Sequence, residues 1–125
     1  MFKYDPLNLD KEFNDPRKVY WVFKLIMRMM GIAFHAKFAK MLTLTCLGRD
    51  YNPKSAHYCI DKLICGADIR SYDLTVEEME WLVELNKFIK PYMDIIIEDE
   101  RISGVKPKGG NHIHCELNPA WWFKF

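Results

Sequence analysis

Several features that would assign this chain to a common class are missing from its sequence. The most apolar stretch, residues 19–34, is interrupted by Lys24 and Arg28, so it is a poor membrane span and a better core helix. Eighteen basic and seventeen acidic residues give a net charge of +1, which is not the electrostatic footprint of a protein that binds nucleic acid or anionic lipid. We therefore expect no membrane span and no nucleic-acid partner.

A secretory signal and paired cysteine motifs are also missing. The opening MFKYDPLNLDKEF has neither a basic start nor an apolar block, which predicts a protein that is cytoplasmic when made. The four cysteines show no CxxC spacing, and in a cytosolic protein they are most simply reduced thiols: Cys46, Cys59, Cys65 and Cys115.

Two segments have apolar residues at helical spacing. Asp15-Pro16 predicts the start of the first, with an acid at the N-cap and proline at the first helical position, and Gly31 is expected to end or bend that helix. Residues 75–78 (TVEE) form a capping box that predicts the start of the second helix, and Pro91 marks its end.

Four other stretches are typical of strands, near residues 42–47, 65–70, 94–98 and 111–117. The chain has 125 residues, half of them apolar or aromatic, which is enough for one ordinary core. We expect a single α+β domain over residues 1–125, in which a small antiparallel sheet is flanked by two main helices.

The segment NHIHCEL, residues 111–117, combines a strand pattern with reactive side chains. Because side chains alternate along a strand, His112, His114 and Glu116 share one face, and the residues between them share an apolar face. Imidazole nitrogens suit zinc and similar ions, but a metal site needs further ligands from elsewhere in the chain.

Few such ligands are available, since the chain has only four histidines. His57, Asp68 and His114 would give the open tetrahedral site of a catalytic zinc, with water in the fourth position. A closed structural site is the alternative, in which Cys59 or Cys65 joins His57 and the histidine pair.

The order of the segments TCLGRDYNPKSAH, GADI and NHIHCEL resembles a family of zinc peptidases. The family comprises D-alanyl-D-alanine carboxypeptidases, vancomycin-resistance D-Ala-D-Ala dipeptidases and L-alanyl-D-glutamate endopeptidases of bacteriophage endolysins, and the amino-terminal domain of hedgehog proteins shares its zinc site. The resemblance covers roughly residues 42–117. The positions that match the family pattern, in order, are Arg49, Ser55, His57, Ala67, Asp68, His112 and His114.

The resemblance implies a role for each of these positions. His57, Asp68 and His114 would hold Zn²⁺ in a cleft on the sheet, and His112 would help to stabilise the oxyanion of the tetrahedral intermediate. Arg49 would pair with a substrate carboxylate through its planar fork of donors. Ser55 is a second candidate for substrate binding, and the ordinary alternative is that it satisfies a backbone group of its loop.

The chain departs from the family pattern at two points. Ten residues separate His57 from Asp68, more than in the family, which leaves Asp61 as an alternative ligand. Asn111 stands where many members have the acidic general base, and an amide cannot accept a proton from water. A base must then come from elsewhere, and the candidates are Glu116, Glu98 and His112.

The resemblance implies a zinc metallopeptidase that hydrolyses a peptide bond of bacterial peptidoglycan, with a stem peptide or its precursor as the partner. The resemblance implies a bacterial or bacteriophage setting, in which a chain without a signal would be released by host lysis or carried in a virion. The alternative is a catalytically degenerate zinc-binding module with a structural or recognition role, such as a virion component.

Aromatic residues are concentrated near the end of the sequence, at residues 121–123 (WWF). We expect them to pack back onto the core, and a sugar-stacking or partner-binding surface is the alternative.

Overall fold

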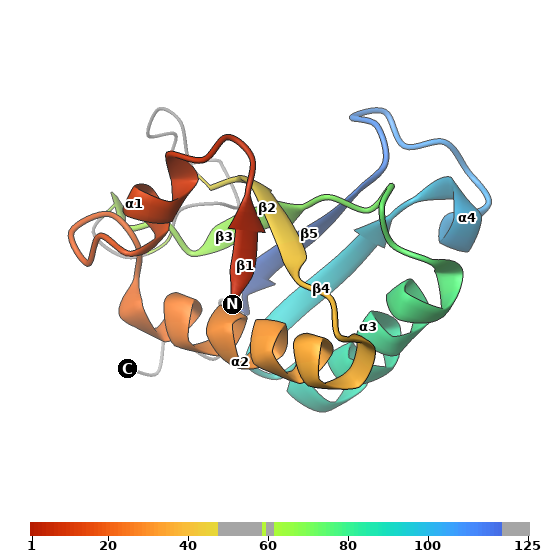
Figure 1. Ribbon diagram of the computed structural model, residues 1–125, viewed down its shortest axis with the longest axis horizontal. Helices are drawn as coiled ribbons and strands as arrows, with labels where there is room; N and C mark the ends of the chain where they lie inside the picture. Colours follow the sequence, from red (N-terminus) through yellow and green to blue (C-terminus); the bar gives the residue numbers. More distant parts are fainter. Residues whose placement is uncertain (48–58, 60–61, 119–125) are drawn as a thin grey trace.

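The computed structural model describes residues 1–47, 59 and 62–118 (Figure 1). The protein is α+β, as expected, and its sheet is open and has five strands in the order β1-β2-β3-β5-β4. The elements are β1 (Phe2–Tyr4), α1 (Leu9–Phe13), α2 (Trp21–Phe38), β2 (Leu42–Cys46), β3 (Gly66–Ile69), α3 (Val76–Ile89), β4 (Met93–Glu98), α4 (Glu100–Ser103) and β5 (His112–Leu117).

The sheet is mixed rather than wholly antiparallel. The four strands expected from the sequence correspond to β2, β3, β4 and β5, and they pair antiparallel with one another. A fifth strand, β1, pairs parallel with β2, with Phe2 opposite Leu42. Its three residues are too few to show a period of two in the sequence, so this strand and the mixed character were not predicted.

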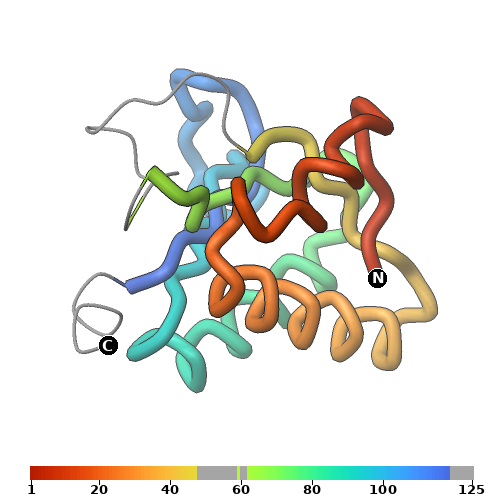
Figure 2. The backbone as a smooth tube through the Cα atoms, turned by 90° about the vertical axis from the view of Figure 1, so that its left-hand side faces the viewer, coloured from red at the N-terminus to blue at the C-terminus, as the bar shows by residue number. Residues whose placement is uncertain are grey.

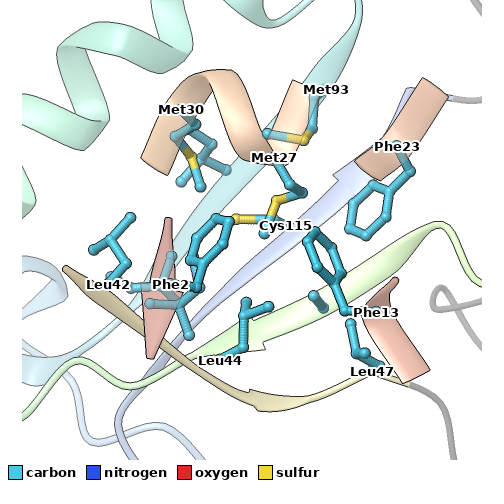
Figure 3. Close-up of a cluster of buried hydrophobic side chains, with 14 of the residues drawn as sticks. Phe2, Phe13, Phe23, Met27, Met30, Leu42, Leu44, Leu47, Met93 and Cys115 are labelled. Atoms are coloured by element: carbon cyan, nitrogen blue, oxygen red, sulfur yellow. The ribbon is translucent and has the colours of Figure 1, made fainter. Parts of the chain in front are cut away.

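The two long helices, α2 and α3, lie on the same side of the sheet (Figures 1 and 2). Their apolar faces meet the apolar face of the strands, and Figure 3 shows side chains of α2 such as Phe23 and Met27 together with Leu44 and Cys115. All four of these residues are fully buried. Helix-on-sheet burial of this kind is the main source of stability in a domain of this size.

Helix α2 begins later than expected and continues further. Backbone hydrogen bonds between Lys18 or Tyr20 and Ile64 hold residues 18–20 in an extended bridge, so the helix starts only at Trp21. Gly31 does not end the helix, because α2 runs on to Phe38. A Cβ on Gly31 would lie 3.0 Å from both the Met1 carbonyl oxygen and the Phe2 ring, so glycine there allows β1 to pass close to the helix.

Helix α3 begins where the capping box predicted. The Glu78 backbone N–H donates to Thr75 Oγ1 at 3.1 Å, and the Thr75 N–H donates to Glu78 Oε1 at 2.7 Å.

Among the residues that the structure describes, neither α3 nor α2 is long and apolar enough to cross a membrane.

An ion pair between the buried Asp99 and the partly exposed Arg101 ties α4 to the segment before α3. Asp99 has no exposed surface and accepts hydrogen bonds from Arg101 Nε at 3.0 Å and from Ser71 Oγ at 2.7 Å. Arg101 also donates to the carbonyl oxygens of Ser71 and Leu74, each at 2.7 Å. The Arg101 guanidinium holds the pKa of Asp99 well below its usual range, although burial alone would raise that pKa. This network fixes the chain directly after Glu98, the last residue of β4.

The Asp99→Asn variant should lose about 2 kcal/mol of unfolding free energy at pH 7, because a buried carboxylate with charge-assisted hydrogen bonds is worth about that much. A depressed carboxyl pKa stabilises the fold above the unfolded value of about 3.9, and this stabilisation is lost as the pH falls below it. Urea unfolding from pH 7 to pH 3 should therefore show a steeper loss in the wild type than in the variant. The exposed Glu84–Lys87 pair provides a control, since Glu84→Gln should change stability by less than about 0.5 kcal/mol. Equal acid dependence of wild type and Asp99→Asn would contradict the assignment.

Candidate metal centre

Strand β5 lies between β3 and β4, and its two faces differ as the alternating sequence predicted. Ile113 and Cys115 have no exposed surface and Leu117 is 2% exposed, so this face is part of the core. His112, His114 and Glu116 alternate with these residues and are partly exposed on the other face. The strand therefore presents its polar side chains on the side of the sheet away from α2 and α3.

The sheet register brings His114 directly opposite Asp68 of β3. His114 Nδ1 lies 2.9 Å from Asp68 Oδ1, and these residues are 46 positions apart in the sequence. The other ring nitrogen, Nε2, lies 3.2 Å from Glu116 Oε2 on the same strand. The imidazole is thus held between two carboxylates, and its side chain is only 13% exposed.

The surroundings of His114 act on its protonation in opposite directions. Burial lowers the pKa of His114, but the hydrogen bonds to Asp68 and Glu116 and the charges of both carboxylates raise it, and the net result is a pKa above the ordinary value. In the metal-free protein, both ring nitrogens can then donate, one to each carboxylate.

His112 forms a second pair with Glu98 at the end of β4. The two residues are opposite each other in the register, and His112 Nε2 lies 3.4 Å from Glu98 Oε2. His112 Nδ1–H donates to the Gly110 carbonyl oxygen at 2.8 Å, which fixes the orientation of the ring. The Glu98 side chain is 45% exposed, so its carboxylate is accessible to water.

Asn111, which precedes this pair, has a structural contact. Its side-chain oxygen accepts a hydrogen bond from the Glu100 backbone N–H at 3.2 Å, at the start of α4. Asn111 therefore holds α4 against the start of β5. The register places the Glu98 carboxylate at the same end of β5 from the neighbouring strand, which the sequence pattern of β5 alone did not indicate.

Two of the three expected zinc ligands are therefore in contact, and their chemistry fits the ion. An aspartate oxygen and an imidazole nitrogen are both zinc donors, and a ligating histidine ordinarily gives its other ring N–H to a carboxylate, as His114 does to Glu116. Within residues 1–47, 59 and 62–118, no group of three or more potential metal ligands is assembled. The third expected ligand, His57, lies outside the described residues, as do Asp61, Arg49 and Ser55.

The alternative closed site that would use a cysteine receives no support from the described thiols. Cys65 is 3% exposed and belongs to the apolar core. A hydrogen bond with the neighbouring Cys59 and burial both raise the pKa of the Cys65 thiol in the metal-free protein.

One acidic residue on this face was missed from the sequence. Asp94 of β4 lies opposite Glu116 of β5. Because Asp94 and Glu98 are four positions apart on one strand, their side chains share a face. The alternation in residues 94–98 (DIIIE) is the signal that would have identified it, because positions 94, 96 and 98 of a strand point to one side.

Comparisons of the chain with protein-family models, with curated proteins and with solved structures gave no match.

The contact between Asp68 and His114 can be tested by titrating the metal-free protein. The Asp68→Asn variant should lower the pKa of His114, because it removes the charge beside Nδ1. A raised histidine pKa stabilises the fold fully below the unfolded value of about 6.5, and that contribution is lost as the pH rises through the higher folded value. NMR titration of the ring protons, in the presence of a chelator, measures this pKa, and the signal is assigned by its loss in His114→Gln. An unchanged pKa in Asp68→Asn would show that the two side chains are not paired.

Proposed function

We propose that the protein is a zinc-dependent metallopeptidase that hydrolyses a peptide bond of bacterial peptidoglycan, in the manner of a D-Ala-D-Ala carboxypeptidase or an L-Ala-D-Glu endopeptidase. The observation that supports this most strongly is the 2.9 Å contact between Asp68 and His114. The family pattern marks these two residues as ligands of one ion, and the folded chain brings them together from opposite strands.

In the proposed site, Asp68 and His114 hold Zn²⁺ together with His57. Glu116 positions His114 by accepting the N–H of Nε2, which directs Nδ1 towards Asp68 and the metal. Zinc, when bound, polarises the scissile carbonyl and lowers the pKa of water to about 7. Arg49 and Ser55 are the proposed contacts of the substrate, with Arg49 pairing with its carboxylate.

Of the three candidates for the general base, we propose Glu98. Glu116 is occupied with a ring nitrogen of the ligand His114, whereas the Glu98 carboxylate is accessible and, among the described residues, pairs with His112. Glu98 would accept the proton of the attacking water and pass it to the leaving amine. His112, held by its Nδ1–H bond to Gly110, would donate to the developing oxyanion from Nε2 only as the doubly protonated imidazolium, whose charge the neighbouring Glu98 carboxylate would stabilise.

One observation favours a second candidate, a recognition module that binds zinc without turnover. Asn111 stands in the position of the family's acid and holds α4 through its hydrogen bond to Glu100, which is a structural role. The module would keep Asp68 and His114 as ligands and bind the same peptides. It differs from the peptidase only in lacking a base, so it predicts metal and peptide binding without a hydrolysis product.

The purified protein should bind one zinc ion per chain, and Asp68→Ala or His114→Ala should abolish binding, because each removes one of three protein ligands. Asp10→Ala in α1 and His35→Ala in α2 are controls of the same residue types, and both should retain zinc. Elemental analysis after zinc reconstitution measures the content. Chelation should stop the cleavage of stem peptides, followed by mass spectrometry, and zinc should restore it. The absence of zinc from the reconstituted wild type would exclude the peptidase and the recognition module alike.

Glu98→Gln and Glu116→Gln should have different effects. Removal of a general base typically lowers kcat by about 10²–10⁴-fold, so Glu98→Gln should lose turnover at unchanged zinc affinity. Removal of a residue that orients a ligand weakens metal binding by about 10–100-fold, so Glu116→Gln should reduce zinc affinity. Competition with a chromogenic chelator gives the affinity, and peptide cleavage at saturating zinc gives kcat. Full activity of Glu98→Gln would show that another residue is the general base.

A further inference from the structure

An apolar groove lies between α2 and α3, on the side of the sheet away from the histidines. Its volume is about 640 Å³, within the range of about 300–1,000 Å³ that is typical of ligand pockets. It is lined by one face of α2 from Tyr20 to Ala33, by the last turns of α3 and by Tyr92. Of the lining residues that the structure describes, none is charged.

The exposed apolar residues of the groove are neighbours on one helix and are not scattered singly over the surface. Trp21 is 66% exposed, Met29 is 61% exposed and Leu25 is 49% exposed, and all three lie on the same wall. They are four residues apart along α2, so they form a continuous stripe on the helix. A contiguous apolar surface of this kind usually marks a contact with another segment or molecule.

The chain itself leads an aromatic segment to the end of this groove. After β5, the Asn118 backbone N–H donates to the Tyr92 carbonyl oxygen at 2.9 Å, and Asn118 Nδ2 donates to the Lys90 carbonyl oxygen at 3.0 Å. Tyr92 is one of the residues that line the groove. The sequence continues from this anchor as PAWWFKF, residues 119–125, in which four of seven residues are aromatic.

The length of the segment matches the length of the groove. Seven extended residues span at most about 23 Å. The α2 wall, from Trp21 to Ala33, is about 18 Å long at the helical rise of 1.5 Å per residue. An extended segment that starts at Asn118 can therefore reach the whole wall. Its aromatic side chains are the kind that apolar walls of this size accommodate.

We propose that residues 119–125 occupy the groove between α2 and α3, with one of the alternating Trp121 and Trp122 rings packed against Met29 of α2 and the other towards Ile89 of α3. The segment would then cover the exposed stripe of α2 and fasten the end of β5, the strand that carries His112 and His114. This contact does not depend on the proposed peptidase activity, because the groove and the histidines are on opposite sides of the sheet.

A double-mutant cycle on the full chain tests the proposal. Met29→Glu places a charge in the groove, and Trp121→Ser with Trp122→Ser removes the aromatic rings of the segment. Each change alone should lower Tm by about 4 °C or more, and their combination should add little to either, since both remove the same contact. Ile32→Glu is the matched control, because Ile32 is 54% exposed on α2 and does not line the groove. It should leave Tm nearly unchanged.

Two further measurements distinguish this occupant from others. NOEs between the Trp121 or Trp122 rings and the Met29 methyl group, in a sample that light scattering shows to be monomeric, would establish the contact directly. Fully additive losses of Tm, or the absence of these NOEs, would overturn the proposal. A dimer that dissociates on Met29→Glu and persists without residues 119–125 would also overturn it, because the groove would then be occupied by a second copy of the chain.

Discussion

The position of β5 between β3 and β4 is the constraint on which the rest of this structure depends. Alternation along β5 sends Ile113, Cys115 and Leu117 into the core and leaves the histidines and Glu116 on the other face. A shift of one residue in register would bury the polar set and expose the apolar set, so the core fixes the register. The same register then places His114 opposite Asp68 and His112 opposite Glu98. The packing of the hydrophobic core thus determines which polar groups meet.

The surrounding structure holds the His112 end of this arrangement. The fully buried Asp99 follows directly on Glu98, and its bonds to Arg101 and Ser71 tie α4 to the segment before α3. Asn111 joins α4 to the start of β5 from the other side. An acid at position 111 would present a carboxylate to the same backbone N–H, but Glu98 already supplies a carboxylate at this end of β5. Position 111 thus serves the backbone of α4 in this chain, and the carboxylate at this end of β5 is that of Glu98.

The sequence was informative where a pattern is long and local. The capping box of α3, the four longer strands and the two faces of β5 follow from periods of 3.6 and 2 and were all predicted. Features set by distant contacts were not. The bridge to Ile64 delays the start of α2, and the close passage of β1 explains why a glycine stands at position 31 inside that helix. Neither contact leaves a signal in the local sequence. For the site, residue types and order marked Asp68 and His114, and alternation placed Glu116 on the same face, but only the register of β4 against β5 brings Glu98 to His112.

The central claim is that Asp68 and His114 share one metal ion with His57. Diffraction from crystals grown with zinc, measured on both sides of the zinc absorption edge, tests it most directly, because the anomalous signal locates the ion independently of the protein coordinates. The account predicts a single peak in contact with Asp68 Oδ1, His114 Nδ1 and the His57 ring. A crystal with no anomalous peak, or with its peak at Cys59 and Cys65, would contradict it.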